Sequence, residues 1–220
     1  MDMDHASLGL AIVSIVALGY ASNWLNWRFL NYRITHLLYY VGAFVHESSH
    51  AALCVLTGTK IYEFKVFSSQ PHVTHAARRP PFIREFLISS APIFGGLLFL
   101  FLVNQYVLGG SFTVPTFDGQ WQDLLMAPIH LIREIRLYAW QSWVMIALFI
   151  NIGAMLGPSI QDIKNSWPVL VLLFFVSSPV LVNLCFLALC LIAVNIIFQI
   201  ALIIAVNVGK IGALLIRRFV

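Results

Sequence analysis

The sequence predicts an all-α polytopic membrane protein, and three observations carry this prediction. Of the 220 residues, 60% are hydrophobic, and the mean hydropathy is +0.87. Only 10% are charged, whereas soluble domains carry about 25%. Apolar runs approaching the roughly 20 residues that a helix needs to cross a bilayer recur along the whole chain. We therefore expect about six transmembrane helices, with one short membrane-associated β-hairpin after the second.

The apolar runs define the candidate spans in order. The last part of the chain, 168–208, is nearly unbroken apolar sequence that only Ser177-Ser178-Pro179 interrupts. Its length suits two spans, although the interruption also fits a half-span followed by one long helix. With two spans there, the expected set is 8–24, 35–57, 86–108, 138–158, 167–187 and 188–209.

The segment 60–75 differs from the spans because it predicts strands. Polar and apolar side chains nearly alternate over 61–67, with aromatic and β-branched residues among them. Ser68-Ser69-Gln70-Pro71 is typical of a turn, and 72–75 suits a return strand. An open strand edge is unstable in lipid unless it finds a partner. The hairpin edge is therefore a candidate for binding an extended peptide by strand addition.

The distribution of charge predicts an orientation. The net charge of +4 comes from few groups, and no basic stripe alternates with aromatics, so we expect lipid contact and no nucleic-acid binding. With six spans, the N-terminus, the 58–85 loop, the 158–166 segment and the C-terminus share one side. That side carries nine of the 13 Lys and Arg residues, so the positive-inside rule places the N-terminus, the hairpin loop and the C-terminus in the cytoplasm.

The pattern His46-Glu47-Ser48-Ser49-His50 lies near the middle of the apolar run 37–56. Two histidines at i and i+4 share one face of a helix and can bind zinc, and the glutamate between them can act on a water molecule at the metal. Each ionisable group inside a span costs roughly 3 kcal/mol or more, so three without a role are not expected. The alternative interpretation is a pair of histidines that hydrogen-bond to neighbouring helices, with the glutamate as their partner.

A catalytic zinc ion usually has three protein ligands, so a third ligand must come from elsewhere in the chain. Asp162 is our first candidate, because the glycines and the proline between Asn151 and Asp162 allow the backbone to leave helical form at depth. The alternative role for Asp162 is to cap the helix that follows it. Glu63 and Glu134 are the rival ligands.

These motifs together resemble the site-2 protease family of intramembrane zinc metalloproteases, over about residues 35–166. The third-ligand segment of that family has the form NxxPxxxxDG. Here Asn151, Pro158 and Asp162 match it loosely, with a wider Asn-to-Pro gap and with Ile163 in place of the glycine. The stretch from Ser90 to Gly96 is similar to a small-residue segment of the family's third core span, with alanine in place of the usual glycine.

The resemblance implies cleavage of a peptide bond in or near a transmembrane segment of a membrane protein. It implies one Zn²⁺ per chain, bound by His46, His50 and Asp162, with Glu47 as general acid and base. Asn151 and Pro158 would contact the substrate. We expect one membrane-embedded domain over 1–220, in which 35–166 form a three-span catalytic core and 167–220 form accessory spans. The sequence carries no signal for the number of copies in an oligomer.

Three other classes of function are weighed against this hypothesis. A di-iron membrane oxidase needs several HxxxH pairs, whereas within the spans only His46 and His50 form one. A catalytically silent homologue has no need of Glu47. A transporter would be favoured by inverted repeats, which the sequence does not display. We therefore expect a membrane-embedded zinc metalloendopeptidase whose partners are the lipid bilayer and a transmembrane or membrane-anchored protein substrate.

Overall fold

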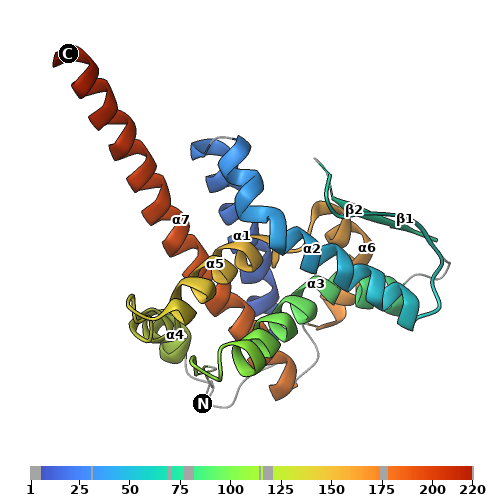
Figure 1. Ribbon diagram of the computed structural model, residues 1–220. Coiled ribbons are helices and arrows are strands. Elements are labelled where there is room, and N and C mark those ends of the chain that lie inside the picture. Colours follow the sequence, from blue (N-terminus) through green and yellow to red (C-terminus); the bar gives the residue numbers. More distant parts are fainter. Residues whose placement is uncertain are drawn as a thin grey trace.

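The computed structural model describes residues 6–30, 32–68, 71–76, 82–113, 115, 121–173 and 178–219. These residues form a helical bundle with a small hairpin at one side (Figure 1). A π-helical turn, η1 (Val103–Val107), continues the third helix. The helices are α1 (Ala6–Phe29), α2 (Tyr32–Leu56), α3 (Phe82–Leu102), α4 (Trp121–Arg133), α5 (Trp140–Met155), α6 (Ile160–Leu173) and α7 (Pro179–Phe219), and the strands are β1 (Ile61–Lys65) and β2 (His72–His75).

Three of the described helices are long and apolar enough to cross a membrane, which makes this a membrane protein, but six spans are not confirmed. They are Leu8–Phe29, Ile83–Val107 and Pro179–Lys210. The pair α5 and α6 becomes a fourth if it counts as one span, bent by 70°. The predicted span 138–158 ends early because α5 stops at Met155, before Gly157 and Pro158. The predicted span 35–57 corresponds to α2, which is not among these three helices. The polar residues of the HExxH pattern lower its hydropathy.

The prediction of separate spans over 167–187 and 188–209 is wrong. Helix α7 runs unbroken for 41 residues, because neither glycine nor proline interrupts 180–208. The alternative, a half-span followed by one long helix, agrees with α6 and α7. The far end of α7 extends beyond the other helices, and α1 and α7 run in the same direction (Figure 1). The side of the membrane on which each terminus lies stays a prediction.

The predicted hairpin is confirmed. Strands β1 and β2 pair antiparallel, with Phe64 opposite Val73 and Lys65 opposite His72, and an irregularity lies between Ile61 and Glu63. Residues 69 and 70 of the predicted turn lie outside the described residues. The hairpin lies beside α2 (Figure 1), and its association with the membrane stays a prediction.

Two glycines allow α2 to approach its neighbours closely. A Cβ at Gly42 of α2 would lie 2.0 Å from the Asn151 carbonyl oxygen of α5. A Cβ at Gly95 of α3 would lie 1.9 Å from Ser49 Oγ of α2. Real side chains essentially never approach so closely. The two glycines therefore hold α2 directly between α3 and α5.

Candidate metal centre

Helix α2 and the start of α6 bring three buried ligand-type side chains together. His46 and His50 lie one helical turn apart, and their Nε2 atoms are 3.2 Å from each other. Asp162 Oδ1 lies 3.6 Å from His50 Nε2. One ligand atom from each of the three residues lies within 4.8 Å of the other two. No other such group of His, Cys, Asp and Glu occurs among the described residues.

The second nitrogen of each imidazole is hydrogen-bonded to a backbone carbonyl. His46 Nδ1 lies 2.7 Å from the carbonyl oxygen of Met155, and His50 Nδ1 lies 2.7 Å from that of Ile88. A carbonyl oxygen can only accept, so each Nδ1 must carry the proton. Both Nε2 atoms therefore present lone pairs to the centre, and this outer hydrogen bond is the one that metal-bound histidines typically make.

Irregularities in two helices free these carbonyls. Pro92 lies inside α3, four residues after Ile88. Because proline has no N–H, the carbonyl of Ile88 loses its usual helical partner. Met155 is the last residue of α5, and the last carbonyls of a helix have no intrahelical partners. Each histidine therefore donates a hydrogen bond to a carbonyl that has no partner within the helix that carries it, which is α3 for Ile88 and α5 for Met155.

Asp162 has two roles in the geometry, one for each oxygen. Its Oδ2 accepts hydrogen bonds from the backbone N–H of Ser159 (2.9 Å) and from Ser159 Oγ (2.6 Å). The backbone N–H of Asp162 donates in turn to Ser159 Oγ (3.1 Å), which completes a capping box at the start of α6. The cap holds the carboxylate in place, and Oδ1 faces His50. Asp162 therefore caps the start of α6 with one oxygen and lies next to the histidines with the other.

This donor set fits a zinc ion. Two imidazole nitrogens that both carry lone pairs repel each other at 3.2 Å unless a cation or proton lies between them. Two neutral imidazoles and one carboxylate are a ligand set that zinc accepts in catalytic sites. All three residues are buried, with only 6–8% of each exposed. The residues present therefore suit the metal that the HExxH pattern predicts.

The rival acids are engaged elsewhere. Glu63 on β1 forms an ion pair with Lys65 (2.5 Å) and lies 3.2 Å from His72 Nε2. These hydrogen bonds, from Lys65 first and then from His72, hold the pKa of the Glu63 carboxyl below its usual range. Glu134, just after α4, accepts a hydrogen bond from the backbone N–H of Thr113 (3.0 Å). Neither acid belongs to the His46, His50 and Asp162 group.

Glu47 and His46 line a cavity of about 840 Å³. Its walls come from α1, α2, the turn of the hairpin and the break between α5 and α6, and Pro158 is among them. Glu47 is only 6% exposed, and its carboxylate accepts a hydrogen bond from the backbone of Val73 on β2. The general base predicted from the sequence therefore faces both the cavity and the hairpin.

Asn151 does not line this cavity. Its amide nitrogen donates to the Ala147 carbonyl (2.9 Å), and its amide oxygen accepts from the backbone N–H of Val41 on α2 (3.3 Å). The side chain thus links α5 to α2. Contact of Asn151 with a substrate stays a prediction.

The sequence interpretation missed several contributors to the centre. The carbonyls of Ile88 and Met155 and the Ser159 cap were not expected. Two signals were readable, namely a proline inside an apolar helix and the Ser-x-x-Asp spacing of a capping box. The partnership of His46 with Met155 carries no local signal, because it depends on the packing of α2 against α5.

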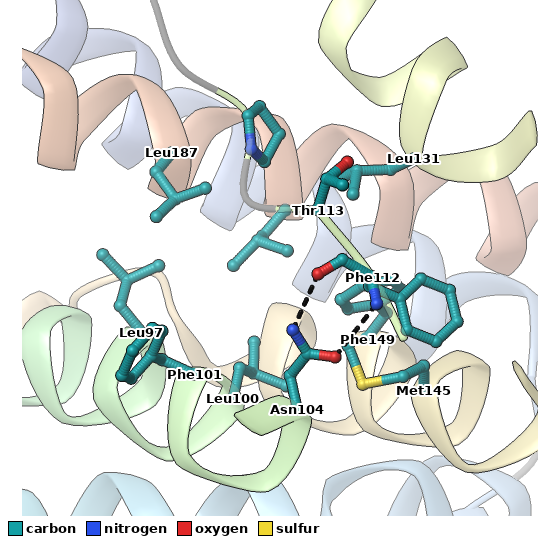
Figure 2. Close-up of a pocket in the computed structure, with 12 residues that line it drawn as sticks. Leu97, Leu100, Phe101, Asn104, Phe112, Thr113, Leu131, Met145, Phe149 and Leu187 are labelled. Carbon is teal, nitrogen blue, oxygen red and sulfur yellow. Dashed lines mark hydrogen bonds between the residues drawn. The ribbon is translucent and has the colours of Figure 1, made fainter. Parts of the chain in front are cut away.

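A second cavity, of about 80 Å³, lies among α3, α4, α5 and α7 (Figure 2). Its lining is almost entirely apolar, and both polar groups of Asn104 are bonded to the backbone of Phe112, at 2.7 and 3.1 Å. No histidine, cysteine or acid lines it. This cavity therefore offers no group for metal binding or proton transfer.

Comparison with known proteins agrees with the geometry of the centre. A family model described as peptidase M50B-like matches residues 15–184. Searches of curated proteins and of solved structures each found no match to the chain. The matched segment covers more than half of the chain and includes α2, α5 and the start of α6, which carry the candidate centre. The chain therefore belongs to the peptidase M50B-like family, a site-2 protease family.

Proposed function

We propose that this protein is an intramembrane zinc metalloprotease that hydrolyses peptide bonds in or near transmembrane segments of other membrane proteins. One observation carries the proposal. The ligand atoms of His46, His50 and Asp162 converge within 4.8 Å, beside a cavity that Glu47 also lines. Membership of a peptidase family supports the same conclusion.

The residues of the centre have distinct roles in this reaction. His46, His50 and Asp162 would hold the zinc ion. When bound, zinc would supply Lewis acidity, which makes water acidic enough to react near neutral pH and polarises a carbonyl group. Glu47 takes a proton from the attacking water and delivers it to the leaving amine.

The hairpin gives an extended substrate a place to bind. A peptide bond in a transmembrane helix has its carbonyl hydrogen-bonded, so the segment must unwind before it can react. Among the described residues the sheet has two strands, so each strand keeps one edge without a strand partner. A substrate strand added to such an edge would gain backbone hydrogen bonds. Because Glu47 contacts the backbone of Val73, this edge lies next to the proposed base.

The first test measures zinc content and cleavage on purified protein in detergent, with a membrane-protein reporter as substrate. Wild type should hold about one zinc per chain. Glu47→Gln should keep the zinc and lose cleavage by about 10²- to 10⁴-fold, as expected for loss of a general base. His46→Ala should lose both.

Glu134→Gln is the matched control, because this acid lies just after α4, outside both the centre and the hairpin, and should leave zinc and cleavage unchanged. Cleavage by Glu47→Gln at the wild-type rate would refute the assigned mechanism. Wild-type protein that neither contains nor takes up zinc would refute the metal centre itself.

A further inference from the structure

Four uncharged polar side chains on α1 and α7 are fully buried, and the proposed reaction uses none of them. We call this group the polar seam: Ser22 and Asn26 on α1, and Asn195 and Gln199 on α7. All four have 0% exposure. Both helices are apolar and long enough to cross a membrane. Polar groups buried at such a position need an explanation.

Hydrogen bonds satisfy the amide nitrogens of the seam but not its amide oxygens. The amide nitrogens of Asn195 and Gln199 both donate to Ser22 Oγ, at 2.8 and 2.9 Å. Asn26 Nδ2 donates to the hydroxyl of Tyr39 on α2, at 3.1 Å. The amide oxygens of Asn26, Asn195 and Gln199 are buried and find no partner in the described part of the chain. Because two of the amides share one hydroxyl, their oxygens lie within about 5 Å of it.

These oxygens require a donor, and the choice of donor follows from charge. Hydrocarbon supplies no donor, so an unsatisfied acceptor in a membrane span is strongly disfavoured. A metal cation would suit oxygen ligands, but the seam has no negative charge to balance it. Water needs no counter-charge, and a buried water typically joins two to four polar groups. Water is therefore the favoured occupant.

One member of the seam, Asn26, is connected by hydrogen bonds to the cavity that Glu47 lines. The Tyr39 hydroxyl that accepts from Asn26 also donates to Asn23 Oδ1, at 3.0 Å. Tyr39 and Asn23 both line the cavity that contains Glu47. Asn26 lies one turn of α1 beyond Ser22, so the hydrogen bonds that begin at Asn26 bring the polar groups of the seam to within one helical turn of a chain that ends at the cavity.

We propose that the polar seam is a binding site for internal water, and that this water exchanges with the catalytic cavity. Each peptide bond that is hydrolysed consumes one water molecule, which must reach a centre surrounded by apolar helices. The seam holds water close to that centre. The evidence for a water-binding site is the unpartnered amide oxygens, and it does not depend on the proposed function. The supply of this water to the hydrolysis reaction does rest on the proposed function.

A cysteine introduced into the seam tests whether water reaches it. The thiol of Ser22→Cys is exposed to a small water-soluble methanethiosulfonate reagent, and the modified peptide is quantified by mass spectrometry. Ala11→Cys is the matched control, since Ala11 also lies on α1 with 0% exposure but packs in the hydrophobic core. We expect modification about tenfold faster at position 22, because thiol reactivity follows access to solvent. Equal rates at the two positions would show a dry helix contact and overturn the proposal.

The amides are tested in the same reporter protein. Adding Asn195→Leu and Gln199→Met removes two of the unpartnered oxygens at similar side-chain size. The rate at position 22 should then fall to that of Ala11→Cys. A rate that stays high would mean that water reaches the thiol without the amides, and would overturn their assignment as the binding site.

Two measurements do not depend on whether the reporter variants fold. A crystal structure of the wild-type protein should show ordered water within hydrogen-bonding distance of Asn195 Oδ1 and Gln199 Oε1. An anomalous peak there after a thallium soak would identify a monovalent cation and overturn the assignment to water.

With the reporter substrate, Gln199→Met alone should lower kcat at unchanged zinc content, and an unchanged kcat would overturn the supply role. If wild type cleaves nothing, the proposed function fails while the thiol and crystal results still decide the water site.

Discussion

Replacing Pro92 by alanine should make the protein more stable and at the same time weaken its binding of zinc. Proline inside a helix is less favourable than alanine by up to about 3 kcal/mol. For a chain of this size, each kcal/mol raises Tm by about 2–4 °C. The substitution also introduces an N–H at position 92, which competes with His50 Nδ1 for the carbonyl of Ile88, now 2.7 Å from that nitrogen. Loss of such an outer partner weakens metal binding by about 10- to 100-fold.

The assay for Pro92→Ala has two readouts. Thermal unfolding of the zinc-free protein reports stability, and competition with a chelator reports the Kd for zinc. Pro168→Ala is the matched control, because Pro168 also lies inside a helix, α6, but is not four residues beyond a histidine partner. It should leave the zinc affinity unchanged. Zinc binding by Pro92→Ala at wild-type affinity would refute the reasoning, and so would a joint fall in affinity and Tm, which indicates a general packing defect.

Three further predictions follow from the geometry. Asp162→Ala should lower zinc from about one per chain to near none, measured by elemental analysis. Gly42→Ala places a Cβ 2.0 Å from the Asn151 carbonyl oxygen, about 1 Å too close, and should destabilise by about 1–3 kcal/mol in thermal unfolding. Phe67→Ala removes ring stacking on Tyr40 at 5.0 Å, so hydrogen exchange in β1 and β2 should become faster by up to about tenfold.

Each of these predictions has a control in the same chain. Glu134→Gln should keep its zinc, and loss of zinc in that variant instead of in Asp162→Ala would reassign the third ligand. Gly209→Ala adds a Cβ with nothing within 4 Å, so a Tm equal to that of Gly42→Ala would contradict the packing argument. Phe64→Ala alters an exposed aromatic residue in β1. Equal exchange in Phe64→Ala and Phe67→Ala would show that stacking does not hold the hairpin.

Much of the fold and the central motif could be predicted because they depend on local patterns. The i, i+4 spacing of His46 and His50 places both rings on one face of any helix, whatever surrounds it. The alternation over 61–67 indicates a strand in the same local way, and the hairpin is confirmed. Composition alone indicates a membrane protein. The count of six spans is not confirmed, because apolar length does not show where a helix bends or continues.

Local patterns in the sequence were enough to predict a helical membrane protein, a pair of histidines on one helix face with a glutamate between them, and a hairpin after that helix. The acid that lies next to the histidines, Asp162, could be identified only from the way the helices pack. Its role as a zinc ligand stays a prediction. The 70° bend between α5 and α6 turns Asp162 back toward α2, and the packing of α3 and α5 supplies the carbonyls of Ile88 and Met155. A periodic pattern reports on residues only a few positions apart. The histidines and their partners are separated by 38 to 112 positions in the sequence and meet only through packing.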